Sequence, residues 1–424
     1  MKGSEVARLR ERAMRNRRSV LLSAAALAGT AVAGRWAHAN EEIRVGVLSP
    51  MTGPAARFGA IQQSTLALGV EEVNGTGGIR SLGGAKLRLI FGDTRGEADM
   101  GVTETERLIT RERVHALIGA FQSGVGLPSS AVAERYEVPW LNFGTVDRIT
   151  QRGFRYIFRP HANDTLKARA LVEGIISLGA AHGGLKTGVI LSENTEWGKS
   201  VADKQKTFLE EARVEIKLVE HYPYAAPDLT SMVVKARALR PDLVLANSYL
   251  GDALLITRLM GEYQLRPTVY AAGGGGHLQP DFVGGAGALA EGVICATAWD
   301  PAVGRKVPWI KEVNDRHVAR NGVPITEDAA CYYQCFQVLV DALERSKDLD
   351  PKKIRDAIAA TDITDPNHKA MFVPCTRLSF DQTGQNPTAT AMVVQVQQGK
   401  LRLVYPAAAA EPDVTPIWPY ARKA

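Results

Sequence analysis

The sequence predicts an α/β protein of two lobes, each built around a parallel sheet. Short apolar runs alternate with amphipathic stretches, which is typical of parallel strands covered by helices on both faces. The alternation occurs twice, in blocks of roughly 110 to 130 residues, and each block is one domain's worth of chain. About 385 residues remain after an N-terminal leader, more than a single hydrophobic core usually serves.

Strands are expected where the apolar runs are short and end in turn residues. They are 43–48, 87–91, 116–119 and 139–143 in the first block, and 188–191, 243–246 and 269–272 in the second. The amphipathic stretches predict helices at 60–74, 98–112, 163–180, 197–212, 228–240 and 252–264. The tail adds expected helices at 306–321, 326–346 and 351–361, and a hairpin of 391–396 with 401–404.

Residues 1–39 have the features of an export signal. Basic residues precede an apolar stretch at 20–33, which is shorter than the ~20 residues of a membrane span. Ala37-His38-Ala39 is the small-x-small pattern that signal peptidase accepts, so we expect cleavage near Ala39 and a periplasmic protein. A permanent N-terminal anchor is the alternative. Arg17-Arg18 fits a twin-arginine signal, but a general secretory signal explains it equally.

The positive charge of the chain belongs to this leader. The whole chain has 51 basic and 45 acidic residues, of which the leader holds eight basic and two acidic, so 43 of each sign remain. A balanced charge gives no reason to expect nucleic acid as a partner.

Four cysteines, Cys295, Cys331, Cys335 and Cys375, have no zinc-site spacing, and we expect no metal. Cys331 and Cys335 lie one helical turn apart, and export permits either to pair with Cys375. Buried free thiols are the alternative.

Loops rich in glycine, serine and threonine follow the expected strands, as in 49–54, 119–124 and 143–145. In parallel α/β sheets, ligands bind beyond the carboxyl ends of the strands, so two facing lobes would form a cleft for a small molecule. The sequence has no nucleophile elbow, no phosphate-binding loop with Lys and Ser or Thr, and no dinucleotide fingerprint, so we expect neither an enzyme nor a cofactor.

The order of these motifs resembles the type I periplasmic binding proteins of the leucine/isoleucine/valine class, which serve ATP-driven importers. The resemblance covers nearly all of 43–405. The segments that carry it are Val45–Pro54 with Phe58-Gly59, Val73–Ile79, Gly92-Asp93, Leu117–Gly119, Ile149–Phe154 before Phe158-Arg159, Trp197-Gly198 and Pro241–Val244.

The resemblance implies two Rossmann-like lobes joined by a three-strand hinge. Lobe one would comprise 41–160 plus 294–378, and lobe two 161–293 plus 379–424. It further implies a monomeric solute-binding component of an ABC importer. This component would close on a small solute (a carboxylate, an amide or an amino-acid-like molecule) and deliver it to a membrane permease. A sensor of the same fold that docks to a signalling receptor is the alternative.

The resemblance also assigns ligand contacts. Phe58, Trp197 and Tyr249 occupy the places of aromatic residues that pack on the ligand, although each has the alternative of a core position. Ser123 occupies the place of a hydroxyl that holds the ligand carboxylate, with a helix N-cap as its alternative. Gly144 and Thr145 match the next contacting loop.

Gly273 is the informative departure from the family pattern. Amino-acid-binding relatives carry a glutamate there for the ligand's ammonium group, but this chain has four glycines, 273–276. Because an unpaired ammonium in a closed cleft is costly, we expect an uncharged or anionic solute, with the glycines leaving room for a bulky group such as an aromatic ring. Arg57 and His277 are further cleft candidates.

Overall fold

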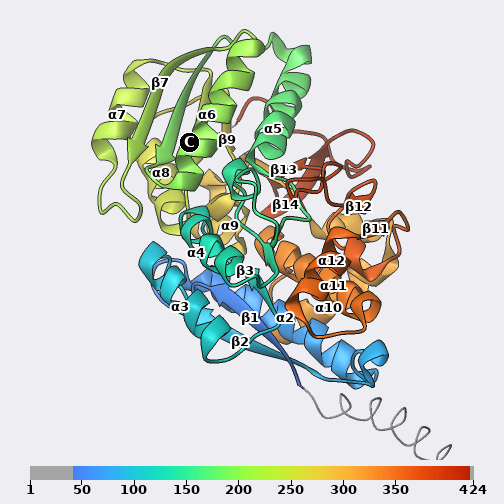
Figure 1. The fold of residues 1–424 in the computed structure, drawn as a ribbon. Coiled ribbons are helices and arrows are strands. Elements are labelled where there is room, and N and C mark those ends of the chain that lie inside the picture. The colour runs from blue at the N-terminus through green and yellow to red at the C-terminus, as the bar shows by residue number, and fades with distance from the viewer. Residues whose placement is uncertain (1–41, 421–424) are drawn as a thin grey trace, which may run out of the picture.

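The computed structural model of this chain describes residues 42–420, which form two α/β lobes (Figure 1). The expected export signal lies outside the described residues. One lobe contains a five-stranded sheet and the other a seven-stranded sheet. A small ribbon of β11 (Asp362–Ile363) and β12 (Leu378–Ser379) is separate from both. The predicted α/β class with two lobes is confirmed.

The sheet of the first lobe is entirely parallel, in the order β2-β1-β3-β4-β5. Its strands are β1 (Ile43–Ser49), β2 (Leu87–Asp93), β3 (Ala116–Gly119), β4 (Trp140–Asn142) and β5 (Ile157–Phe158). Successive side chains point to opposite faces, so Val47 enters one hydrophobic core and Leu48 the other. Both faces of the sheet are therefore buried, as the continuous apolar runs predict.

Helices cover both faces of this first sheet. They are α2 (Ala56–Gly75), α3 (Ala98–Thr110), α4 (Ser123–Arg135), α10 (Pro308–Asn321), α11 (Glu327–Ser346) and α12 (Pro351–Ala359). Helices α2 and α11 pack together on one face, and α3 packs with α4 on the other. The α2–α11 approach requires Gly69, because a Cβ there would lie 2.8 Å from the ring of Phe336.

The sheet of the second lobe has the order β14-β13-β10-β9-β8-β6-β7. Its strands are β6 (Thr187–Glu193), β7 (Glu215–Tyr222), β8 (Leu243–Asn247), β9 (Val269–Ala272), β10 (Ile294–Thr297), β13 (Met392–Gln397) and β14 (Lys400–Tyr405). The first five are parallel, and β13 and β14 form the predicted antiparallel hairpin beside β10.

Five helices cover the second sheet: α5 (Asp164–Gly179), α6 (Glu196–Glu211), α7 (Thr230–Ala238), α8 (Leu250–Glu262) and α9 (Pro280–Ala286). Helices α5 and α6 share one core, and α7, α8 and α9 share the other. Short 3-10 turns occur at Arg80–Leu82, Asp147–Ile149, Ala180–His182, Gly275–Leu278, Gly287–Leu289, Pro301–Arg305 and Lys369–Met371.

The chain passes between the lobes three times, at 159–163, 298–307 and 380–391. The first and third crossovers lie side by side, because the Arg159 amide donates to the Gly384 carbonyl at 2.8 Å and the Asn386 amide donates to the Arg159 carbonyl at 2.9 Å. The prediction that the chain returns to lobe one at residue 294 is wrong, because residues 294–297 pair with strands of lobe two. Strand β10 lies between β9 and β13 in the second sheet, and a short apolar strand carries no sign of which sheet it joins.

All four cysteines are free thiols, so neither considered pairing with Cys375 forms. Cys295, Cys331 and Cys335 are buried, and the Sγ of Cys375 lies 3.5 Å from the Sδ of Met371. Within residues 42–420, no helix has the length and apolarity needed to cross a bilayer.

Candidate functional site

A small cavity lies between the two lobes, beyond the carboxyl ends of strands from both sheets. Its volume of about 30 Å³ is the space of roughly one water molecule. Both lobes contribute to its lining, which consists of Phe58, Phe121, Ser123, Phe143, Thr145, Lys167, Trp197, Tyr249, Gly275, Leu278, Gln279, Glu327 and Asp328.

Aromatic rings from both lobes meet around this cavity. Tyr249 of lobe two lies edge-on to Phe58 of lobe one, with ring centroids 5.8 Å apart, and contacts Phe121 at 5.4 Å. On its own lobe, Tyr249 stacks on Trp197 at 5.2 Å. Phe143 extends the wall by stacking on Phe121 at 5.6 Å. The body of the cavity is therefore apolar, and Tyr249 joins the rings of the two lobes.

Hydrogen-bond donors line another part of the cavity, at the start of α4. Ser123 is the first residue of this helix, one position after the N-cap, and it is buried. Its Oγ accepts hydrogen bonds from the amides of Thr145 at 3.1 Å and Val146 at 3.3 Å. The hydroxyl proton of Ser123 is left to donate, and the first turn of a helix favours a negative group.

Sequence reasoning missed three charged residues of this site. The Lys167 ammonium on α5 donates to Glu327 Oε1 on α11 at 2.6 Å, which joins the two lobes. Asp328 is the next residue along α11, and burial raises the pKa of its carboxyl. Charged residues on amphipathic helices normally face water, so nothing in the local pattern identifies them.

Five of the seven expected contacts, Phe58, Ser123, Thr145, Trp197 and Tyr249, line the cavity. The other two, Gly144 and Gly273, are not among the lining residues. Gly144 places its carbonyl 2.7 Å from Arg159 Nη1, which donates to it. Gly273 donates from its amide to Asn247 Oδ1 at 3.1 Å, and a Cβ there would meet Val201 at 2.6 Å.

The glycines after β9 make room for protein side chains. A Cβ at Gly274, where φ is +115°, would lie 2.9 Å from Lys167 Nζ. A Cβ at Gly275, where φ is +65°, would lie 2.7 Å from the Trp197 ring. In this structure Lys167 and Trp197 occupy the space beside these two glycines, and Gly275 also lines the cavity, so room for a bulky part of the solute stays a prediction.

The two further candidates also lie outside the cavity. Arg57 forms an ion pair with Asp281 of lobe two, and both side chains are partly exposed. His277 is fully buried in lobe two, where its Nε2 lies 2.9 Å from the Tyr270 hydroxyl. Burial lowers the pKa of His277 to about 3, so this imidazole is neutral in the folded protein.

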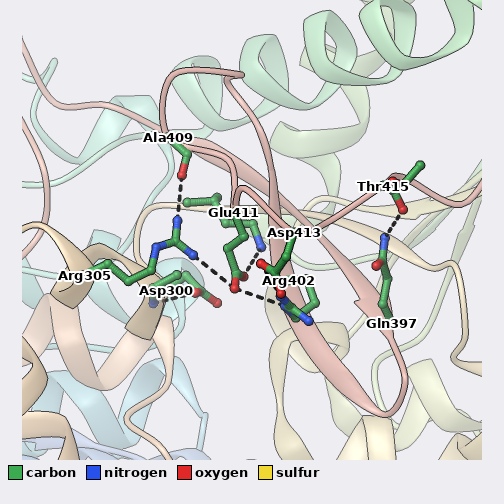
Figure 2. A network of polar contacts seen from close by, with 10 residues as sticks. Asp300, Arg305, Gln397, Arg402, Ala409, Glu411, Asp413 and Thr415 are labelled. Carbon is green, nitrogen blue, oxygen red and sulfur yellow. Dashed lines mark hydrogen bonds and ion pairs between the residues drawn. The ribbon is translucent and has the colours of Figure 1, made fainter.

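A second, larger hollow of about 920 Å³ adjoins the cavity and shares Leu278 and Glu327 with it. Figure 2 shows an ion-pair network along its wall. Arg305 of the second crossover bonds Glu411 at 3.0 Å, and Arg402 on β14 bonds the same carboxylate at 3.1 Å. The network thus ties the second crossover to lobe two.

Two α/β lobes, three crossovers and an aromatic-lined cavity between the lobes define a type I periplasmic binding protein. The profile described as "periplasmic binding protein" matches residues 42–400. Leu/Ile/Val-binding protein homolog 7 of Brucella suis is 34% identical over 411 residues, spanning 93% of this chain and 98% of the relative. The chain therefore belongs to the periplasmic binding protein family, among the Leu/Ile/Val-binding proteins.

Solved structures agree on the fold. The branched-chain amino acid transporter substrate binding protein LivJ from Streptococcus pneumoniae, in complex with isoleucine, has a TM-score of 0.74 at 22% identity, covering 86% of this chain and 100% of its own. A solute binding protein of an ABC transporter from R. palustris, in complex with benzoate, has a TM-score of 0.73 at 19% identity, covering 86% and 96%.

Proposed function

We propose that this protein is the extracytoplasmic substrate-binding component of an ABC importer. It is exported, processed near Ala39, and works in the periplasm as a monomer. It captures one small solute between its lobes by hinge closure and passes it to a membrane permease. Its action is binding and release, with no chemical step. The single observation that carries the proposal is a cavity with side chains from both lobes, placed beyond the strand ends.

The size of the cavity supports closure around the solute. A volume of about 30 Å³ admits no molecule with an aromatic ring or a branched chain. The lobes must therefore part for entry, and the three crossovers provide the hinge. After closure, the rings that now contact one another would contact the solute instead.

The chemistry of the lining supports a solute with a carboxylate on an apolar body. Phe58, Phe121, Phe143, Trp197 and Tyr249 supply aromatic surface for the body. The free Ser123 hydroxyl proton and the first turn of α4 supply donors for the carboxylate. Isoleucine and benzoate, the ligands named for the two structural relatives, both have this form.

A binding screen of the processed protein tests the proposal. Benzoate, isovalerate and leucine form the panel, each with its amide: benzamide, isovaleramide and leucinamide. A solute that binds only the folded state stabilises it by about 2.7 kcal/mol at one hundred times its Kd, so we expect a clear rise in Tm with at least one carboxylate. Titration calorimetry should then give one site per chain. A folded protein whose Tm is unchanged by the whole panel contradicts the proposed solute class.

A further inference from the structure

The Lys167–Glu327 ion pair is the only contact between opposite full charges on the cavity wall, among the residues that the structure describes. Lys167 lies on α5 of lobe two and Glu327 begins α11 of lobe one. The side chains are 6% and 8% exposed, and the atoms are 2.6 Å apart. Removing two charges from water is costly, so a buried pair beside a binding cavity calls for an explanation beyond stability.

The acidic residues of the cavity already have hydrogen-bond partners. Glu327 Oε1 accepts from Lys167 and also from the Ala298 amide at 2.7 Å. Asp328 accepts from Gln62 Nε2 at 2.7 Å and from Gln279 Nε2 at 3.2 Å, one bond on each carboxylate oxygen. An ammonium group entering this cavity would therefore compete with donors that the protein itself supplies to these two carboxylates.

The Lys167 ammonium has more N–H groups than its one ion-pair partner accepts. An ammonium carries three N–H groups, and Glu327 accepts one of those of Lys167. Its Nζ lies over Gly274, where any Cβ would approach to 2.9 Å, so the backbone leaves space for the charged group. Lys167 is also the single basic residue of the described cavity lining. A buried ammonium with open donors favours an anion.

Ser123 supplies a neutral donor to the same cavity. Its Oγ accepts hydrogen bonds from two backbone amides, which leaves the hydroxyl proton free to donate to a ligand. A carboxylate has two oxygens and accepts from both a hydroxyl and an ammonium. Ser123 belongs to lobe one and Lys167 to lobe two, so an anion held by both would also hold the lobes together.

We propose that Lys167 selects solutes that carry a carboxylate, and that Glu327 is a positioning residue that holds the Lys167 ammonium at the cavity. This inference rests on the proposed function and names the charge that the site selects. The Ala298 amide in the second crossover fixes Glu327, and Glu327 in turn fixes Lys167. In the absence of solute, Glu327 is the counter-ion that keeps this ammonium from being buried alone.

The test compares each carboxylate of the panel with its amide, by calorimetry, in four proteins. They are the wild type, E327Q, the double variant K167M/E327Q, and K235M/E220Q as the matched control. The control makes the same substitutions in the Lys235–Glu220 pair on lobe two, whose atoms are 2.5 Å apart and whose side chains are 56% and 32% exposed. The double variant leaves no buried charge unpaired, so it avoids the instability expected of K167M alone.

We expect the carboxylate-over-amide preference to fall about 10- to 100-fold in K167M/E327Q, which is the loss of one charge-assisted hydrogen bond. E327Q keeps an acceptor for both Lys167 and the Ala298 amide but removes the counter-ion of the Lys167 ammonium, so the empty protein should be less stable than the wild type. Where it is folded, as circular dichroism would show, it should bind the carboxylates at least as tightly as the wild type. K235M/E220Q should match the wild type.

An unchanged preference in K167M/E327Q overturns this inference and leaves the proposed function standing. If the wild type binds leucine and a folded E327Q does not, while E327Q still binds benzoate, the inference is also overturned, because Glu327 would then be assigned to an ammonium group. A wild type that binds none of the panel overturns both this inference and the proposed solute class.

Discussion

The Arg159 guanidinium in the first crossover donates to Gln385 Oε1 in the third, at 2.6 Å, and both side chains are buried. The same guanidinium donates to the carbonyls of Gly144 at 2.7 Å and Val146 at 2.8 Å, in the loop beside the cavity. Burial lowers the pKa of Arg159 to about 10, so it stays charged at neutral pH. One side chain therefore connects two crossovers to the candidate site.

The R159M variant tests this connection. It leaves two carbonyls and the Gln385 side chain without their donor, and each unsatisfied buried group costs ~1–3 kcal/mol. We expect the free energy of unfolding in urea to fall by about 3 kcal/mol or more. R88M removes an exposed arginine that pairs with Glu42 and should change stability by less than ~0.5 kcal/mol. Equal effects of the two variants would refute the structural role of Arg159.

Tyr249 is the ring through which lobe two meets Phe58 and Phe121 of lobe one. A Y249L variant keeps an apolar side chain but loses the aromatic contact, which is worth ~0.5–1.5 kcal/mol beyond burial. We expect the affinity for the best solute of the panel to fall roughly tenfold by calorimetry. Y136L, at a tyrosine that is 39% exposed, serves as the control. If Y249L and Y136L bind the solute with the same affinity, Tyr249 does not contribute to binding.

Asp300 makes stability depend on pH. Burial raises the pKa of its carboxyl to about 7 in the folded protein, whereas the unfolded value is about 3.9. Between these values the folded state keeps a proton that the unfolded state releases, so stability falls as pH rises from 4 to 7, and the cost remains at higher pH. The Oδ1 atom of Asp300 accepts from the Ala302 amide at 2.8 Å, and the neutral carboxamide of the D300N variant would accept the same bond.

We therefore expect D300N to be more stable than the wild type by an amount that grows between pH 4 and 7, by about 1.4 kcal/mol per pH unit at most. Denaturation curves across this range measure it. D228N is the control, because the hydrogen bonds from Thr230 lower the pKa of the exposed Asp228 carboxyl. If the free energy of unfolding changes with pH in the same way in D300N and the wild type, Asp300 does not keep a proton in the folded protein.

Export has a direct mass-spectrometric test. If signal peptidase cleaves after Ala39, the protein recovered from the periplasm begins at Asn40. Replacing Arg17 and Arg18 with lysine should stop export if the twin-arginine route is used and leave it intact if the general route is used. An intact N-terminus beginning at Met1 in the membrane fraction would indicate the permanent anchor instead.

Much of the fold follows from local patterns. The predicted strand at 43–48 is β1, Ile43–Ser49, and the predicted helix at 326–346 is α11, Glu327–Ser346. Apolar periodicity identifies such elements because both sheets are buried on both faces. Sheet membership is a tertiary property, which is why the predicted lobe of β10 (294–297) is wrong.

The same limit explains what the sequence does not reveal at the candidate site. Phe58 and Ser123 follow strand-end loops, which local patterns locate. Lys167 and Glu327 are 160 residues apart on two helices, and only the packing of the lobes brings them together. The glycine at position 273 predicts a cleft without a carboxylate, and this part of the prediction is wrong, because α11 brings Glu327 and Asp328 to the cavity.

The structure of the complex with the tightest solute of the panel tests the central claim most directly. The account predicts that the solute lies between the lobes, with its apolar body against Phe58 and Tyr249. Its carboxylate should lie within hydrogen-bond distance, about 3 Å, of both Ser123 Oγ and Lys167 Nζ. A solute bound in the larger hollow beside Arg305, or a carboxylate that contacts neither Ser123 nor Lys167, would contradict the account.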